Sequence, residues 1–132
     1  MAGAELIGQE EIKEVMDVMR TGVLMRYGFD KERQGVFKVR QFEGEFAEYC
    51  GVKHALGVTS GSAALKVALT AMDIGPGDEV LVPAFTFLAT YEAVLEVGAI
   101  PVMCDIDDTL NFDPEEIEKK KTRYTKAVIP VH

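Results

Sequence analysis

The sequence contains little cysteine and little histidine, and this scarcity limits the kinds of site it can form. The 132 residues include two cysteines, Cys50 and Cys104, and two histidines, His54 and His132. Their spacing matches no zinc-binding pattern and contains no Cys-x-x-Cys pair. We therefore expect no metal site, and we predict that both cysteines are buried free thiols in a reducing compartment.

Basic residues are also in deficit, because 14 Lys and Arg stand against 22 Asp and Glu for a net charge of −8. Nucleic acids and anionic membranes require a concentrated basic face, so neither is an expected partner. No apolar run reaches the ~18 residues of a membrane span. Charges at Glu5, Glu10 and Glu11 argue against a signal peptide. These absences predict a soluble, cytoplasmic protein.

The sequence does contain apolar residues in helical and strand-like spacings that alternate along the chain. Its length is that of one domain, and 48% of its residues are hydrophobic. Helical spacing predicts a helix over residues 10–20, then an extended loop over 21–39, then a helix over 41–49 that ends at Gly51. The further predicted elements are strands over 54–59, 79–82, 100–104 and 127–131 and helices over 63–72, 87–97 and from residue 114 onward.

Apolar strands that alternate with helices predict an α/β fold with a mainly parallel sheet flanked by helices. The helix over 63–72 has almost no polar face, so we expect it to be buried on most sides. Asp113 is the predicted N-cap of the last helix and Pro114 its first residue. The sequence ends at the carboxyl end of a strand, where ligand sites of parallel sheets lie. We therefore expect the chain to be truncated.

The turn Ser60-Gly61-Ser62, between a predicted strand and a predicted helix, is the first candidate site. Free backbone N–H groups, the positive end of the helix and two serine hydroxyls favour a bound phosphate. The same residues fit equally well a plain turn in which Ser62 is the N-cap. The turn is neither a Walker A loop nor a G-x-G-x-x-G motif, so it does not favour a nucleotide-binding fold.

Two more candidates follow strands. Phe85 and Phe87 are either rings that stack on a flat ligand or core residues, and the core is the commoner case.

Asp105, Asp107 and Thr109 spell the D-x-D-x-T nucleophile motif of haloacid dehalogenase phosphatases, which use two aspartates and a magnesium ion. Those enzymes need a lysine and acidic residues well downstream, and only 23 residues follow Thr109. We therefore favour an acidic surface turn, and we treat the terminal His132 as structural rather than as a base.

Eight segments, in their order and spacing, match one family: residues 8–11, 42–47, 59–65, 74–80, 82–90, 98–102, 105–107 and 125–132. Together they resemble the beginning of the DegT/DnrJ/EryC1/StrS sugar aminotransferases, which are pyridoxal-phosphate enzymes of fold type I. The resemblance implies a partial aspartate aminotransferase-like large domain. Residues 41–132 would form the N-terminal part of this cofactor-binding domain, and residues 1–40 an N-terminal helix and extended loop.

The resemblance also assigns roles to individual residues. It implies that Gly61, Ser62 and Ala63 hold the cofactor phosphate, with Ser62 in place of the family's usual threonine. Phe87 would stack on the pyridine ring. In this family the segment 105–107 resembles a structural strand end.

Residues 26–30 resemble the branch of the family that aminates C8 of a Kdo-type sugar acid. On that basis, Arg26 and Tyr27 would meet the sugar acid or a neighbouring subunit.

The reaction implied by the resemblance moves an amino group, with glutamate as the donor, onto a keto or aldehyde sugar. The family's acidic partner of the pyridine nitrogen and its Schiff-base lysine lie beyond the position of His132. The resemblance therefore places no catalytic residue in this chain and implies that it is inactive alone. Exposed sheet edges favour a homodimer. The first alternative is a stand-alone phosphate- or cofactor-binding or regulatory α/β module, and the second, less favoured, is a phosphatase that uses Asp105 and Asp107.

Overall fold

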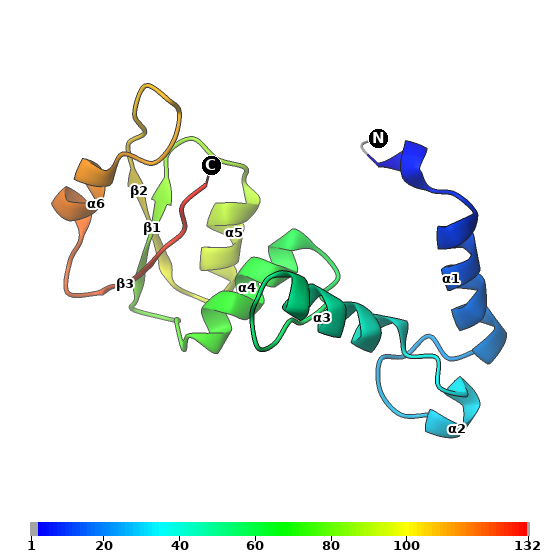
Figure 1. The fold of residues 1–132 in the computed structure, drawn as a ribbon. Helices are drawn as coiled ribbons and strands as arrows, with labels where there is room; N and C mark the ends of the chain where they lie inside the picture. Colours follow the sequence, from blue (N-terminus) through cyan, green and yellow to red (C-terminus); the bar gives the residue numbers. More distant parts are fainter. Residues whose placement is uncertain (1–2, 132) are drawn as a thin grey trace. The chain divides into compact units, whose positions relative to one another are not determined.

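The computed structural model describes residues 3–131. The chain forms two compact units, Met1–Gly57 and Val58–His132, which are described separately below (Figure 1). The terminal His132 itself lies outside the described residues. Among the helices of residues 3–131, none combines the length and apolar character needed to cross a membrane.

The first unit is helical, with a short 3₁₀ turn at Ala4–Leu6 followed by α1 (Gln9–Thr21), α2 (Asp30–Arg33) and α3 (Lys38–Tyr49). At the start of α1 the Gly8 N–H donates to Glu11 Oε2 at 2.7 Å, and Gly22 ends the helix in a left-handed conformation. The predicted helix over 10–20 is therefore confirmed. The predicted loop over 21–39 is wrong in part, because α2 interrupts it and α3 begins at Lys38.

The end of α3 follows the prediction closely. Gly51 has a φ of +65°, and its N–H donates to the Glu48 carbonyl. The Val52 N–H donates to the Ala47 carbonyl at 2.9 Å. This pair of hydrogen bonds is a Schellman cap, which needs a residue that tolerates positive φ at its centre.

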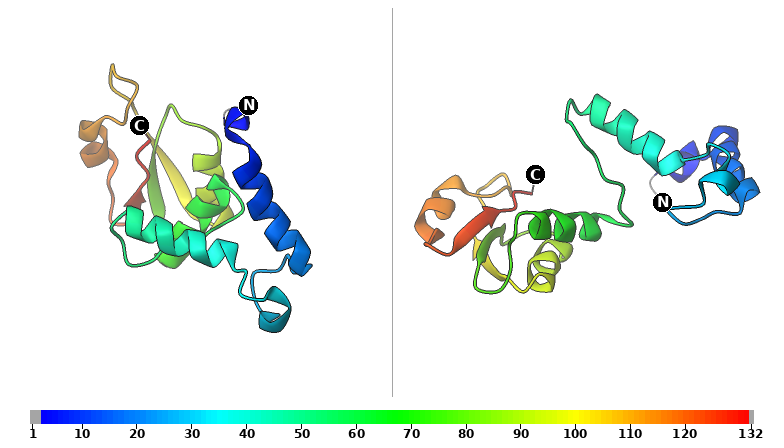
Figure 2. Two further views of the ribbon diagram at one scale, coloured as in Figure 1. Left: turned by 45° about the vertical axis from the view of Figure 1, so that its right-hand side comes forward. Right: turned by 90° about the horizontal axis from the view of Figure 1, so that it is seen from below.

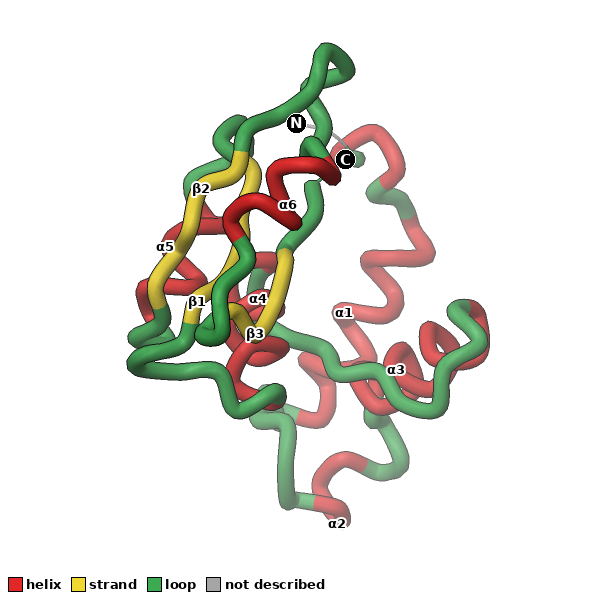
Figure 3. Tube along the Cα trace, turned by 90° about the vertical axis from the view of Figure 1, so that its left-hand side faces the viewer, coloured by secondary structure: helices red, strands yellow, loops and turns green. Residues whose placement is uncertain are grey.

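The second unit contains α4 (Gly61–Ala71), β1 (Glu79–Pro83), α5 (Ala89–Glu96), β2 (Ile100–Cys104), α6 (Pro114–Lys120) and β3 (Thr125–Val128). The three strands form a parallel sheet in the order β2-β1-β3, with Leu81 opposite Val102 on one side and Val128 on the other. Figure 3 shows the strands in yellow between α5 and α6. The predicted α/β fold with a parallel sheet is thus confirmed.

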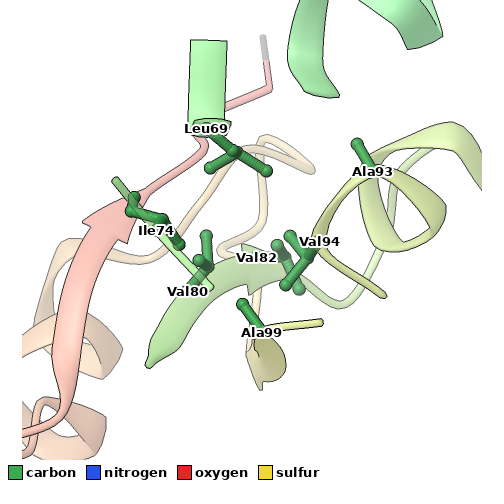
Figure 4. Packing of buried hydrophobic residues seen from close by; sticks show 7 residues of the cluster. All are labelled: Leu69, Ile74, Val80, Val82, Ala93, Val94 and Ala99. Atoms are coloured by element: carbon green, nitrogen blue, oxygen red, sulfur yellow. The ribbon is translucent and has the colours of Figure 1, made fainter. Parts of the chain in front are cut away.

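The central strand β1 supplies the core of this unit, and Val80, Leu81 and Val82 are all fully buried. Alternate side chains point to opposite faces of a strand. Figure 4 shows the larger cluster on one face, where Val80 and Val82 pack with Leu69, Ile74, Ala93, Val94 and Ala99. On the other face, Leu81 packs with Cys104 and Phe112, next to Ile117 of α6.

Local signals at the helix ends of this unit are also confirmed. Asp113 is the N-cap of α6, where its carboxylate accepts a hydrogen bond from the Glu115 N–H at 2.8 Å, and Pro114 follows as the first helical residue. The helix predicted over 87–97 begins two residues later, at Ala89.

Three expectations about burial and pairing are wrong. The segment 54–59 forms no strand, because no strand within residues 3–131 pairs with it. Helix α4 is not buried on most sides, since Leu69 is its buried residue and Val67 is 40% exposed. Cys104 is buried as predicted, and burial raises the pKa of its thiol, but Cys50 is exposed at the end of α3.

Candidate functional site: the first turn of α4

The first turn of α4 is built around Ser60. Its Oγ accepts a hydrogen bond from the Ala63 N–H at 3.1 Å, and its carbonyl accepts one from the Ala64 N–H at 3.0 Å. Ser60 is therefore the N-cap, and the alternative in which Ser62 caps the helix is wrong. Within residues 3–131, the backbone N–H groups of Gly61 and Ser62 have no acceptor, as expected for the first two positions of a helix.

These donors are accessible to a ligand. Gly61 and Ser62 are exposed and Ala63 is half-buried. Apart from the chain neighbours of Gly61 and the backbone of its own helix, no heavy atom of the described residues lies within 4 Å of the place that a Cβ on Gly61 would occupy. The helix behind them has 11 residues, so its positive end adds to the attraction of an anion. Two backbone N–H groups and the Ser62 hydroxyl form a donor set that suits the oxygens of a phosphate.

Phe87 lies in the loop that joins β1 to α5. Its ring is 80% exposed and that of Phe85 is 63% exposed, so neither belongs to the core of this chain. The loop is fixed at its base, because the Tyr91 hydroxyl donates to the Pro83 carbonyl at 2.6 Å. In the ribbon, β1 ends at the edge of the sheet where α5 begins (Figure 1). Phe87 is therefore an available aromatic surface next to a strand end.

Arg26 and Tyr27 belong to the first unit, and Arg26 is already engaged there. Its guanidinium forms an ion pair with Glu43 and donates to the Gly57 carbonyl at 3.3 Å. The Gly57 N–H donates to the same Glu43 carboxylate at 2.6 Å, and these two partners lower the pKa of Glu43. Tyr27 is 75% exposed, with the Arg26 guanidinium 5.7 Å from its ring centre.

Sequence reasoning missed this Arg26–Glu43–Gly57 cluster. Arg26 and Glu43 are 17 positions apart, so no helical or strand period relates them. A Cβ at Gly57 would lie 3.2 Å from Val39 Cγ1 and 3.4 Å from Glu43 Oε1, which is tight. Position 57 therefore favours a glycine, but nothing in the sequence links this glycine to Glu43.

The segment with the D-x-D-x-T motif forms a hydrogen-bonded surface turn. Asp107 Oδ1 accepts from the Thr109 N–H at 2.8 Å and from the Thr109 hydroxyl, which lowers the pKa of Asp107. Asp105 is exposed, and the described residues hold no group of three His, Cys, Asp or Glu side chains arranged for a metal ion. The geometry is that of an acidic turn, with Asp107 engaged by its own neighbour.

Comparison with known proteins places this architecture in a family. The model of the DegT/DnrJ/EryC1/StrS aminotransferase family matches residues 5–132. The chain is 48% identical over 128 residues to the spore coat polysaccharide biosynthesis protein SpsC of Bacillus subtilis, covering 96% of this chain and 31% of SpsC. It is 54% identical over 94 residues to the UDP-N-acetyl-3-dehydro-α-D-glucosamine 3-aminotransferase of Acidithiobacillus ferrooxidans, covering 70% of this chain and 26% of that enzyme.

Among solved structures, 3-amino-5-hydroxybenzoic acid synthase aligns with a TM-score of 0.84 at 40% identity, over 96% of this chain and 31% of that one. NtdA of Bacillus subtilis, solved with bound cofactor PMP, aligns with a TM-score of 0.79 at 33% identity, over 96% of this chain and 28% of that one. The chain therefore spans about a third or less of the length of these relatives. The fold is a partial fold-type-I domain, and the chain belongs to the DegT/DnrJ/EryC1/StrS aminotransferase family.

Proposed function

We propose that this chain supplies the phosphate-binding part of the cofactor site of a pyridoxal-phosphate-dependent sugar aminotransferase. The observation that carries the proposal is the pair of unpaired N–H groups at Gly61 and Ser62, next to the Ser62 hydroxyl. Ala63 completes this turn, and the exposed ring of Phe87 offers a surface for the pyridine ring. When bound, pyridoxal phosphate supplies the carbonyl group and the electron-accepting ring that amino transfer needs.

The roles of the chain's own residues are to bind and to orient. The first turn of α4 fixes the phosphate by hydrogen bonds and by the helix dipole. Phe87 restricts the tilt of the ring by stacking. Arg26 is held by Glu43 and Gly57, so we assign it to positioning the exposed Tyr27, which faces the sugar or a neighbouring subunit.

The substrate is a keto or aldehyde sugar and the amino donor is glutamate. Two relatives support a sugar substrate by their names, one as a polysaccharide biosynthesis protein and one as an aminotransferase of a UDP-sugar. We retain a Kdo-type sugar acid as the narrower candidate, on the basis of residues 26–30. We also propose that the working form is a cytoplasmic homodimer.

We further propose that residues 1–132 do not transaminate by themselves. The resemblance implies that the acidic partner of the pyridine nitrogen and the Schiff-base lysine of the family correspond to no residue of this chain. Incubation with pyridoxal phosphate, borohydride reduction and peptide mapping should give no single preferred lysine. A stoichiometric adduct at one residue would contradict this part of the proposal. Lys66 is the candidate to check, because it lies in α4, a few positions after Gly61 and Ser62 in the sequence.

The phosphate turn is tested by binding of pyridoxamine phosphate, which carries no aldehyde and so forms no Schiff base with surface lysines. Pyridoxamine serves as the phosphate-free ligand. Ser62→Ala should weaken binding of the phosphate form by ~1 kcal/mol, the usual size of one such hydrogen bond. Thr70→Ala is the matched control, because Thr70 lies near the other end of α4 and its hydroxyl bonds to the Lys66 carbonyl. If the two ligands bind equally well, or if the two variants weaken binding equally, the turn is a helix start that binds no phosphate, and the proposal is wrong.

A further inference from the structure

A cluster of cations lies in the first unit, around the ring of Phe37. Residues 20–40 carry six basic and two acidic side chains, a net charge of +4 in a chain of net charge −8. Most of these cations are paired or exposed, but Arg33 and Arg40 form no ion pair with any carboxylate of the described residues. Both guanidiniums lie against the Phe37 ring, at 5.3 Å and 4.5 Å from its centre.

Arg33 is the unusual member of this cluster because it is buried. Its side chain is 7% exposed, and its Nε donates to the Gly28 carbonyl at 2.9 Å. Its Nη2 is buried without a hydrogen-bond acceptor in residues 3–131. A buried guanidinium with an unmatched donor and no counter-charge is unfavourable, and the face of a phenyl ring compensates only a small part of that loss.

The backbone around Arg33 is strained as well. Helix α2 is a single turn, flanked by Phe29 with a φ of +60° and Gln34 with a φ of +50°. L residues other than glycine rarely adopt this conformation, and such residues gather where a ligand or a switch requires them. Figure 2 shows α2, in cyan, close to the start of α3, which is the helix that carries Arg40.

From these observations we propose that Arg33 and Arg40, on either side of Phe37 in the sequence, form a binding site for an oxyanion of a small molecule. The ligand chemistry is a carboxylate or phosphate oxygen that accepts from Arg33 Nη2, with Arg40 supplying a second positive charge. The planar guanidinium suits both groups, because its N–H donors match two oxygens of one anion. Since Nη2 is covered, the α2 turn opens to admit the ligand, and the left-handed residues at its two ends are where it bends. The site involves only residues of the first unit and does not depend on the proposed cofactor site.

The test follows the Nε–H signal of Arg33 in hydrogen–nitrogen correlation spectra of the 132-residue chain during titration. Inorganic phosphate and gluconate are the two anionic probes, and glucose is the neutral control. We expect a saturable shift of the Arg33 signal with a dissociation constant on the order of 1 mM for at least one anion, and none for glucose. Saturation by phosphate alone identifies a phosphate-bearing ligand, and saturation by gluconate alone identifies a carboxylate.

Arg40→Gln is the main variant, because Arg40 is exposed and its removal leaves the buried Arg33 in place. It should weaken binding about tenfold, the size expected for one charge-assisted contact. Lys31→Gln removes the same charge from the exposed side of α2 and should change the affinity less than twofold. Absence of saturation with both anions, or equal losses in the two variants, would overturn the proposal, since only nonspecific attraction would remain.

Discussion

The two units of this chain are stabilised in different ways. Of the described residues in the first unit, Val23 and Ala47 are the buried apolar ones. The second unit buries eleven apolar residues, seven of them in one cluster around β1. In the first unit, segments far apart in the sequence are joined by ion pairs, such as Arg26 with Glu43 and Lys38 with Asp17.

This difference has a simple origin in the elements themselves. A sheet with helices on both faces encloses β1 completely, so its alternate side chains are buried in both directions. Helices α1 and α3 each carry an apolar stripe that no described element of their own unit covers. On α1, Ile12, Val15, Met16 and Met19 are between 45% and 60% exposed. Amphipathic pattern alone therefore shows that a helix can bury one face, and the presence of a neighbour decides whether it does.

The largest expected effect comes from removing core volume in the second unit. Leu69→Ala should lower the free energy of unfolding by about 2–5 kcal/mol, because the side chain is fully enclosed and leaves a cavity. Met16→Ala in the apolar stripe of α1 should change it by less than about 0.5 kcal/mol. Urea unfolding followed by circular dichroism measures both. If the two substitutions cost the same, the α1 stripe is covered in solution and the contrast between the units fails.

Acidification should loosen the first unit before the second. The folded-state pKa of Glu43 lies below its ordinary value of 4.5, because the Gly57 N–H and Arg26 stabilise the charged form. Its contribution is therefore complete above pH 4.5 and is lost as the pH falls through the lowered value. Hydrogen exchange of the Gly57 amide, after correction for intrinsic rates, should rise below pH 4.5, while that of Val82 stays slow.

Glu43→Gln sharpens this comparison, because it removes the charge and keeps the shape. It should speed exchange at Gly57 about tenfold at neutral pH, as expected from losing a charge-assisted hydrogen bond, and should abolish the pH dependence. Glu45→Gln is the control on the same helix, since Glu45 is exposed and, among residues 3–131, its carboxylate accepts a hydrogen bond only from Gln41. An equal effect at position 45 would show that the Arg26–Glu43–Gly57 cluster does not hold the unit together.

A smaller effect is expected at the start of α4. Ser60→Ala should lower the free energy of unfolding of the second unit by ~1 kcal/mol through loss of the helix cap. Ser62→Ala should leave stability nearly unchanged, because its hydroxyl caps nothing in the described chain. Thermal unfolding of the two variants measures this difference. Equal destabilisation would contradict the assignment of Ser60 as the helix cap and of Ser62 as a residue free to bind a ligand.

Local sequence signals predicted much of this fold. The helical period of residues 10–20, the Asp113-Pro114 helix start and the apolar run of β2 each gave the element that the structure shows. The prediction that Ser62 caps α4 failed because two serines flank Gly61 and spacing does not distinguish them. The segment 54–59 has the composition of a strand, but a strand exists only when another one pairs with it.

The candidate site likewise has a part that the sequence indicated and a part that only the structure shows. The strand-turn-helix pattern led to Gly61 and Ser62, and the structure places both N–H groups at an exposed helix end; their role in holding the cofactor stays a prediction. No sequence pattern indicated that Glu43 holds Arg26 or that Arg33 is buried beside Phe37. Those contacts depend on how the segment 22–37, which includes α2, folds back, and no periodic pattern encodes this.

The sequence by itself determined most of the elements and their order along the chain, with α2 and the segment 54–59 as the exceptions, as well as the acidic charge and the resemblance to the family. The elements and the charge are local or compositional, because they depend on residues within a few positions of one another or on simple counts, and the resemblance depends on the order and spacing of short segments. Only the tertiary structure decided the strand order β2-β1-β3, the exposure of α4 and the partners of Arg26 and Arg33. Such features arise when distant segments meet, and their free energy depends on loop closure and packing rather than on any short pattern.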